Sequence, residues 1–347
     1  MKAQPSVDLG RLLELVEAFP RQTILLLGDF VADEYVAGEI ARVSREAPVL
    51  ILRHRETQVV PGGGANAANN LADLGARVLP VAAVGDDAAG AALVDYFRRK
   101  RVDTAGLVRV PGWTTPTKSR FLAGWTHTTR QQVLRVDRLP ETPLPARAKA
   151  ALLRKAKERL KRAGALLVSD YGTGAVTPEL VRPLARGANP PVVTLDSRFS
   201  LFAYRGARIT AATPNEPELE ALYQARIGTD RDALDRLAGR ALRHMRLGAL
   251  LVTRGKDGMV VFERGRKSHA IPIHGTDQAA DVTGAGDTVI AVFTLALAVG
   301  ASYLEAAHLA NYAGGIVVMK RGTATVTRDE LLAAIRGEIT SAPEKPR

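Results

Sequence analysis

Short apolar runs recur along the chain, and segments with the spacing of amphipathic helices separate them. The first run, 23–27, is continuous and ends in Gly28 and Asp29, as expected of a buried strand. This alternation predicts an α/β fold with a mainly parallel sheet and helices on both of its faces. Further strands are predicted at 78–84, 165–168, 191–195, 209–212 and 249–253, and helices at 8–18, 65–74, 90–99, 178–185 and 216–223.

Two segments, 35–60 and 115–136, break this alternation. They are rich in β-branched and charged residues and lack a helical period, which predicts short, partly exposed strands. We expect them to form a small sheet that serves as a lid or as the surface of a homodimer, with ordinary edge hairpins as the alternative. Residues 1–337 are expected to form a single domain, and the polar, proline-containing residues 338–347 a flexible tail.

The composition of the chain excludes several kinds of reactive site and argues against a membrane location. The absence of cysteine excludes disulfides, thiolate catalysis and cysteine-ligated zinc, and none of the six histidines forms a helical i, i+3 or i, i+4 pair. The N-terminus lacks the apolar region of an export signal. The longest apolar run, 289–299, is too short to span a bilayer and predicts a buried helix. We therefore expect a cytoplasmic protein with no membrane partner.

Positive charge exceeds negative charge. Lys and Arg number 48 against 36 Asp and Glu, a formal charge of +12 that could attract nucleic acid or anionic substrates. Much of the excess lies in 147–162, which a solvated face of an amphipathic helix explains. No zinc-finger, KH or RRM signature is present. We expect no nucleic-acid partner, and salt-sensitive, sequence-blind binding to this basic face is the remote alternative.

The segment 281–287, Asp-Val-Thr-Gly-Ala-Gly-Asp, stands directly before that apolar run. A small-residue loop that opens a helix leaves backbone N–H groups for an anion, and Gly284 and Gly286 have no side chain to obstruct a phosphate. Asp287 would then stand where a base takes a proton from an attacking hydroxyl. The arrangement favours phosphoryl transfer, with a glycine turn and a helix-capping aspartate as the alternative.

A second glycine cluster, 61–66 (PGGGAN), precedes a helix of small residues. Its exposed amides, together with the donor and acceptor of Asn66, suit a polyol. Asp33 follows the first strand, and its carboxylate would accept hydrogen bonds from two neighbouring sugar hydroxyls. Each of these features alone is equally consistent with a turn or a helix cap.

Both clusters and the segment 213–218 (TPNEPE) occur in the order seen in the ribokinase-like (PfkB) sugar kinases, which the chain resembles over about residues 20–335. Within that family it is most similar to the heptose 7-phosphate kinases, including the kinase half of a bifunctional bacterial heptose enzyme. It departs from their pattern in the insert 124–129, in PGGGAN where PGGAAN is commoner, and in Thr173 where lysine is frequent. The narrower resemblance is carried by segments 44–49, 115–120, 131–137, 169–174, 204–207 and 322–326.

The resemblance implies a ribokinase-like fold and a kinase that uses ATP and Mg²⁺. The implied reaction phosphorylates the C1 hydroxyl of heptose 7-phosphate to the 1,7-bisphosphate, in the synthesis of ADP-heptose. Another sugar or sugar phosphate, such as fructose, ribose or a hexose phosphate, is the alternative, and a non-catalytic sugar sensor is disfavoured by the intact Asp287 and Glu218. The chain ends just after the kinase region, so we expect a separate protein to perform the nucleotidyl transfer.

The resemblance also implies residue roles. Asp287 would be the catalytic base, beside an anion hole formed by the amides of Gly284, Ala285 and Gly286. Sugar hydroxyls would contact Asp33, Gly62, Gly63 and Asn66. The nucleotide and its Mg²⁺, bound to Glu218 through water, would contact Asn215, Glu218, Thr253, Gly255, Gly258 and Asn311. A K⁺ ion is implied near Asp281, Thr283 and Gly322.

A sugar that already carries a phosphate needs a cation at its far end. Lys118 and Arg120 on the expected lid, with Arg45 near its other strand, are the candidates. A charged edge strand is the alternative for these cations. Glu218 could instead be a first-turn acid that favours the helix dipole, and Gly258 could belong only to a hairpin turn.

Overall fold

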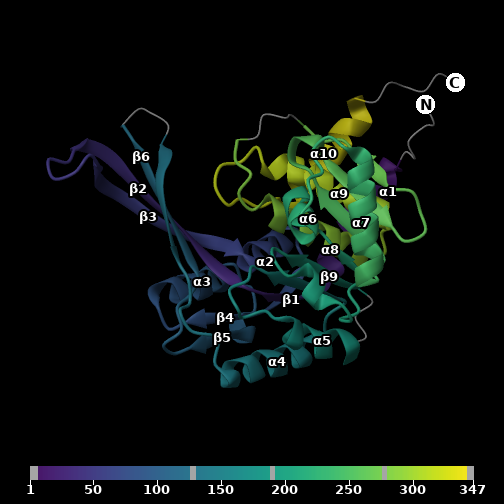
Figure 1. The fold of residues 1–347 in the computed structure, drawn as a ribbon, viewed down its shortest axis with the longest axis horizontal. Helices are drawn as coiled ribbons and strands as arrows, with labels where there is room; N and C mark the ends of the chain where they lie inside the picture. The colour runs from purple at the N-terminus through teal and green to yellow at the C-terminus, as the bar shows by residue number, and fades with distance from the viewer. Residues whose placement is uncertain (1–6, 126–129, 188–191, 276–279, 342–347) are drawn as a thin grey trace.

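The computed structural model describes residues 7–125, 130–187, 192–275 and 280–341 (Figure 1). Its body is a nine-stranded sheet in the order β13-β12-β11-β10-β9-β8-β1-β4-β5. Neighbouring strands from β5 to β11 pair in parallel, whereas β12 and β13 are antiparallel. The strands are β1 (Thr23–Gly28), β4 (Arg77–Gly85), β5 (Leu107–Val110), β8 (Ala165–Asp170), β9 (Val192–Ser197), β10 (Ala211–Ala212), β11 (Ala249–Thr253), β12 (Met259–Glu263) and β13 (His269–Ile271).

Helices cover both faces of this sheet, as the sequence predicts. Alternation along β1 divides the core, because Ile24 and Leu26 pack into one buried cluster while Leu25 and Leu27 pack into the other. The first cluster contains α1 (Leu9–Glu17), α2 (Gly64–Asp73), α3 (Ala88–Arg99), α8 (Ala285–Ala298), α9 (Tyr303–Val317) and α10 (Arg328–Ser341). The second contains α4 (Ala146–Leu160), α5 (Pro178–Gly187), α6 (Glu216–Tyr223) and α7 (Arg231–Met245).

A separate four-stranded sheet, β3-β2-β6-β7, projects from the body (Figure 1). It confirms the expected small sheet, although its strands begin closer to the body than the sequence suggested. Asp33 consequently lies inside a strand rather than in a loop after β1. Of the insert 124–129, residues 126–129 lie outside the described residues. The strands are β2 (Phe30–Val43), β3 (Leu50–Gly63), β6 (Thr117–Gly124) and β7 (Gln131–Arg138).

Several boundaries differ from the expected ones. The strand predicted at 209–212 is reduced to β10, and the antiparallel β12 and β13 were expected only through the alternative of a hairpin turn at Gly258. A short connection through Gly258, whose φ is +75°, returns the chain along β11. Helix α10 continues to Ser341, so residues 338–341 are helical rather than part of a tail.

The predicted buried helix and basic helix are both present. Helix α8 is buried along almost its whole length, and no helix of the described residues is long and apolar enough to cross a bilayer. Helix α4 covers the sheet through Leu152 and Ala156. Its Arg159 forms an ion pair with Asp103 at 2.7 Å, so part of its positive charge serves the fold.

Candidate active site

The predicted site residues gather where β1, β8 and β9 end, the edge at which open α/β sheets bind ligands. Helix α2 begins against the end of β1, and the amide of Gly64 donates to the carbonyl oxygen of Asp29 at 2.9 Å. A Cβ on Gly64 would lie 2.9 Å from the Cα of Gly28. The glycines therefore allow two backbones to approach closely, which brings Asn66 of α2 next to the start of α8.

Asp287 is the third residue of α8 and is 2% exposed. Its Oδ1 accepts a hydrogen bond from the hydroxyl of Tyr171 at 2.8 Å, and its Oδ2 accepts one from Nδ2 of Asn66 at 3.0 Å. Burial raises the pKa of the Asp287 carboxyl to about 7, and the hydrogen bonds from Asn66 and Tyr171 oppose that rise. A carboxyl with this pKa is suited to accept a proton near neutral pH.

The loop before α8 has the backbone that the sequence suggested. Gly284 caps the helix with a φ of +79°, and a Cβ there would lie 2.5 Å from Nδ2 of Asn66. Ala285 and Gly286 both line a pocket beside Asp287. In this conformation the amide of Ala285 donates to the carbonyl of Val282 at 3.2 Å, so the predicted anion hole is only partly open.

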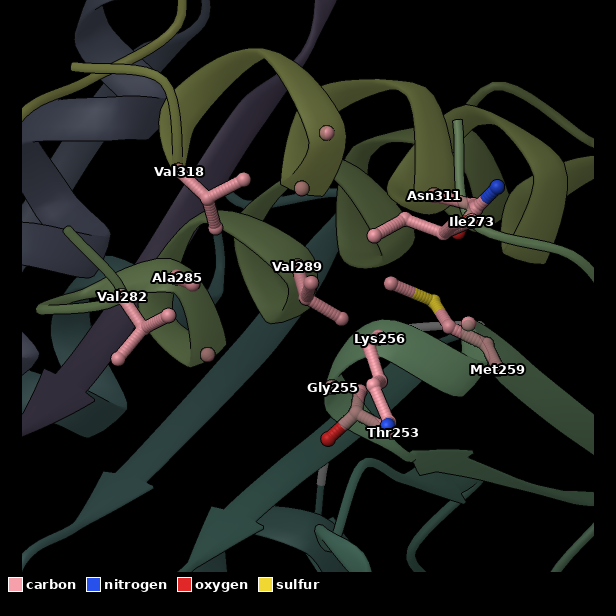
Figure 2. Close-up of a pocket in the computed structure, with 14 residues that line it drawn as sticks. Thr253, Gly255, Lys256, Met259, Ile273, Val282, Ala285, Val289, Asn311 and Val318 are labelled. Carbon is pink, nitrogen blue, oxygen red and sulfur yellow. The ribbon is translucent and has the colours of Figure 1, made fainter. Parts of the chain in front are cut away.

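That pocket collects most of the predicted nucleotide residues (Figure 2). Its walls also carry Met259, Ile273 and Val289, and such apolar walls suit a flat nucleobase. Nδ2 of Asn311 donates to the carbonyl of Pro272 at 2.7 Å and so fixes the loop above the pocket. Gly258 was expected either in the nucleotide site or in a hairpin turn. It has both positions, because it lines the pocket and connects β11 to β12. The predicted residues in the pocket are Thr253, Gly255, Gly258, Ala285, Gly286 and Asn311.

Asn215 and Glu218 form a reciprocal capping box at the start of α6. The amide of Glu218 donates to Oδ1 of Asn215 at 2.8 Å, and Oε2 of Glu218 accepts from the amide of Asn215 at 2.9 Å. Glu218 therefore lies in the first turn of α6, as its alternative role requires, and neither residue lines the nucleotide pocket. Asn215 forms a β-bridge with Thr253, which places the capping box at the border of that pocket.

The donor set near Glu218 fits a Mg²⁺ ion held mainly by phosphate and water. Burial raises the pKa of Glu218, and it raises the pKa of Asp196 well above its usual range, with the charges of Glu218 and Asp287 adding to that rise. A cation would relieve this repulsion between carboxylates. In the described ranges no group of three or more carboxylates or histidines could hold a metal alone. Mg²⁺ commonly binds one or two carboxylates beside substrate phosphates.

The three residues implied for K⁺ come together. The carboxylate of Asp281 accepts hydrogen bonds from the amides of Thr283 and Gly322, both at 2.9 Å. The loop before α8 is thereby joined to the loop before α10. The carbonyl groups of these loops are of the kind that binds such a cation.

On the sugar side, Asp33 already has partners. Its Oδ1 accepts from Nη1 of Arg120 at 2.7 Å, and its Oδ2 accepts from the hydroxyl of Thr323 at 2.8 Å. Gly62 leaves room for this carboxylate, because a Cβ there would lie 2.6 Å from Oδ2 of Asp33. Gly63 adjoins it at the end of β3, with a φ of +55°.

The three candidate phosphate-binding cations differ in their surroundings. Arg120 is buried and paired with Asp33, so in this conformation a carboxylate already engages its guanidinium. Nζ of Lys118 lies 5.4 Å from the ring centroid of Tyr171 and forms no ion pair with the described residues. Arg45 is exposed in the connection between β2 and β3. Figure 1 shows this connection at the end of the small sheet that lies away from the body. Lys118 is therefore the cation placed beside the site.

Two residues of the site received no role from the sequence. Tyr171 belongs to a segment that carried the family resemblance, but its contact with Asp287 spans 116 positions. Asp29 accepts hydrogen bonds from the amides of Tyr171, Thr173 and Val176 at 3.0, 3.0 and 2.9 Å. It thereby holds the loop that follows β8. The only sequence signal for the role of Asp29 was its position directly after a buried strand.

The chain is similar to several known proteins. Residues 30–330 match the pfkB family of carbohydrate kinases. The chain is 36% identical over 326 residues to the bifunctional protein HldE of Desulfatibacillum aliphaticivorans, which covers 93% of this chain and 65% of that protein. It is 39% identical over 314 residues to HldE of Geobacter metallireducens, covering 90% of this chain and 62% of that protein. The chain thus spans slightly less than two thirds of the length of these curated relatives.

Solved structures share the fold. Arabidopsis thaliana ribokinase, complexed with ribose and ATP, aligns with a TM-score of 0.68 at 20% identity, over 91% of this chain and 99% of that one. Escherichia coli phosphofructokinase-2, in complex with substrates and products, aligns with a TM-score of 0.71 at 20% identity and the same coverage. At such identities these similarities establish architecture alone.

Proposed function

The chain belongs to the pfkB family of carbohydrate kinases, and from this premise we propose that it transfers the γ-phosphate of ATP to the C1 hydroxyl of heptose 7-phosphate. The product would be the 1,7-bisphosphate, in the synthesis of ADP-heptose. The similarity to the HldE proteins and the sequence segments that resemble heptose 7-phosphate kinases support this choice of sugar.

The observation that carries the proposal is the position of Asp287. Its buried carboxylate adjoins the pocket that Ala285 and Gly286 line, and its pKa is raised to about 7. An oxygen of Asp287 would take the proton of the sugar hydroxyl as that hydroxyl attacks the γ-phosphorus. The bond from that phosphorus to the bridging oxygen of ADP breaks, and ADP leaves with the electron pair.

The other roles follow from the neighbours of Asp287. The amides around Gly284 and Gly286 would contact the transferring phosphate once the Ala285 amide turns from Val282, and fixed dipoles of this kind stabilise charge that develops in the transition state. Mg²⁺ would neutralise charge on the ATP phosphates, with Glu218 as a water-mediated partner. K⁺ is the proposed ion between the loops at Asp281 and Gly322.

We assign the sugar to the space between the small sheet and the start of α8. Its hydroxyls would donate hydrogen bonds to the carboxylate of Asp33 and contact the backbones of Gly62 and Gly63 and the side-chain amide of Asn66. Lys118 would contact the distal phosphate, because it is the cation beside Tyr171 without an ion pair among the described residues. Arg120 would act indirectly, because its ion pair with Asp33 holds that carboxylate in place.

A homodimer through the small sheet is the proposed assembly. Val133, Leu134 and Val136 of β7 are 48%, 55% and 42% exposed, which is unusual for neighbouring apolar residues on one strand. A second copy would cover them. Light scattering coupled to gel filtration should report a dimer that Leu134→Asp converts to monomer; a monomeric parent protein would refute the assembly.

Turnover of a sugar panel tests the proposed substrate. Heptose 7-phosphate, fructose, ribose and hexose phosphates are offered with ATP and Mg²⁺ in an assay coupled to ADP release. Heptose 7-phosphate should give the highest kcat/KM of the panel, at least about 100-fold above fructose and ribose, since a phosphate bound by a cation adds several kilocalories per mole. A preference for fructose or ribose would favour the alternative substrates, which the shared fold with ribokinase and phosphofructokinase-2 keeps open.

A further inference from the structure

The hydroxyl of Tyr171 is directed at the proposed base. It donates to Oδ1 of Asp287 at 2.8 Å, from a residue that directly follows β8. Burial raises the pKa of this hydroxyl well above its usual range, and the nearby charge of Asp287 raises it further. Tyr171 therefore keeps its proton and acts as a donor throughout the working pH range.

The backbone of the body fixes the place of this tyrosine. Asp29 is fully buried and accepts hydrogen bonds from the amides of Tyr171, Thr173 and Val176. The carboxylate at the end of β1 thus anchors the loop that carries the phenol. The hydroxyl remains beside α8 whether or not the small sheet moves, because none of these contacts involves that sheet.

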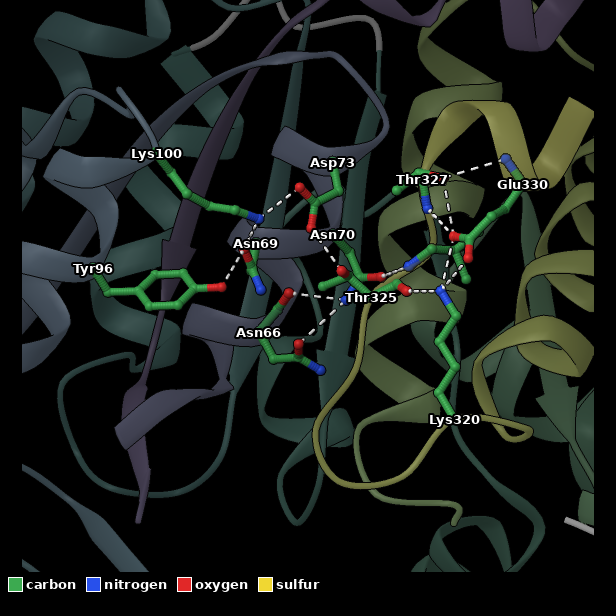
Figure 3. A network of polar contacts seen from close by, with 11 residues as sticks. Asn66, Asn69, Asn70, Asp73, Tyr96, Lys100, Lys320, Thr325, Thr327 and Glu330 are labelled. Carbon is green, nitrogen blue, oxygen red and sulfur yellow. Dashed lines mark hydrogen bonds and ion pairs between the residues drawn. The ribbon is translucent and has the colours of Figure 1, made fainter. Parts of the chain in front are cut away.

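The second oxygen of Asp287 has a donor whose orientation is also fixed. Nδ2 of Asn70 donates to Oδ1 of Asn66 at 3.3 Å (Figure 3). This contact leaves the NH₂ group of Asn66 to face Oδ2 of Asp287. Oδ1 of Asn70 in turn accepts from the hydroxyl of Thr288 at 3.0 Å. Each oxygen of Asp287 therefore has one fixed donor and one remaining lone pair.

We propose that Tyr171 is a positioning residue for phosphoryl transfer: its hydroxyl holds Oδ1 of Asp287 so that the carboxylate is ionised and presents a free lone pair to the sugar hydroxyl. This inference rests on the proposed role of Asp287 as base. Without the phenol the buried carboxylate would retain its proton at higher pH and rotate more freely, because only Asn66 would then hold it.

The expected signature is a change in pH dependence. Removal of the hydroxyl raises the pKa of Asp287, because the hydrogen bond from Tyr171 lowers it. The charged groups that face Asp287 are Asp33 from β2, Lys118 from β6 and Asp196 from β9, while Arg198 after β9 faces Tyr171. All of these remain in Tyr171→Phe, so the phenol is the only altered group.

The test is the pH profile of kcat and kcat/KM for Tyr171→Phe between about pH 5.5 and 9. We expect the acid limb to move upward by about one unit, with kcat reduced about tenfold or more at pH 6 and restored to within about threefold at pH 9. The KM for ATP should not change. A uniform loss of kcat at every pH would overturn the proposal, since a structural defect has no reason to reverse at high pH.

Two variants isolate the cause. Tyr223→Phe is the matched control, because the Tyr223 hydroxyl is buried without a hydrogen-bond partner in the described part of the chain, and its removal should leave the profile unchanged. Asp287→Asn should be inactive at every pH; if it is active, the proposed base is wrong, a result separate from any result for Tyr171.

If Tyr171→Phe does not fold, incorporation of fluorotyrosine, a stronger donor, should shift the acid limb downward, and an unshifted limb would refute the inference.

Discussion

Two buried carboxylates near the same edge of the sheet have opposite kinds of partners. Asp29 at the end of β1 is 0% exposed, and Asp287 in the first turn of α8 is 2% exposed. Asp29 accepts its hydrogen bonds from backbone amides of the loop after β8, whereas Asp287 accepts from the side chains of Tyr171 and Asn66. Equal burial therefore produces a structural anchor in one region and a group available for chemistry in the other.

The two carboxylates differ in whether a proton or a ligand can reach their oxygens. Three amides surround Asp29, and they could leave only if the loop itself moved. Asp287 has one donor on each oxygen, so lone pairs remain for a substrate. Burial is the main cause that raises both pKa values, to about 6 for Asp29 and about 7 for Asp287.

Asp287→Asn should produce the largest effect. An amide of the same size keeps the packing but accepts no proton, so kcat should fall by about 10³-fold or more while the circular dichroism spectrum remains that of the parent. The coupled ADP assay measures the loss. Near-normal kcat in a folded variant would remove Asp287 from the mechanism and abolish the contrast with Asp29.

Asp29→Asn should instead affect stability. The new NH₂ group would face amide donors from the loop at Tyr171 to Val176, leaving buried groups unpaired at a cost of about 2–4 kcal/mol in the free energy of unfolding. Urea denaturation compares this variant with the parent. Unchanged stability together with lost turnover would show that Asp29 acts in chemistry rather than as an anchor.

The pH dependence of unfolding sharpens the comparison. The pKa of Asp287 rises from 3.8 to about 7 on folding, so the folded state binds the extra proton. Its contribution to stability is complete below pH 3.8 and is lost as the pH rises through 7. Between pH 5 and 7 the parent should lose on the order of 2 kcal/mol more than Asp287→Asn, measured by urea denaturation at each pH. Equal losses would indicate that Asp287 is already ionised at pH 5.

Lys118→Ala should have the smallest effect on the fold and a selective effect on binding. Lys118 lies beside Tyr171 and its charge lowers the pKa of Asp287, so its removal affects the reactive region. We expect the KM for the sugar phosphate to rise about tenfold, with stability changed by less than about 0.5 kcal/mol. Steady-state kinetics with sugar phosphate and ATP varied in turn provide the measurement. An unchanged KM for the sugar phosphate would assign its phosphate to other residues.

The sequence predicted local features well. The apolar runs identified most strands, and the small-residue loop before 289–299 identified the start of α8, because a helix terminus and its glycines are defined by neighbours in the chain. Asp287 could be proposed as the base for the same reason. The antiparallel strands β12 and β13 escaped prediction, and β13 is only three residues long, which is too short to show a period.

Sequence patterns did not predict contacts between residues that lie far apart in the chain. Arg120 and Asp33 are 87 positions apart, and only the pairing of β6 with β2 turned an expected phosphate ligand into a buried ion pair. Tyr171 and Asp287 are 116 positions apart, and the packing of α8 beside β8 brings them into contact.

The sequence by itself determined the layered α/β architecture, the glycine loops and the residue that acts as the proposed base. Those properties depend on the period of apolar residues and on the conformational freedom of glycine, both of which are local. The tertiary structure alone decided which carboxylate is anchored by backbone amides and which retains free lone pairs. That outcome depends on burial and on donors from distant strands, and a linear pattern contains neither.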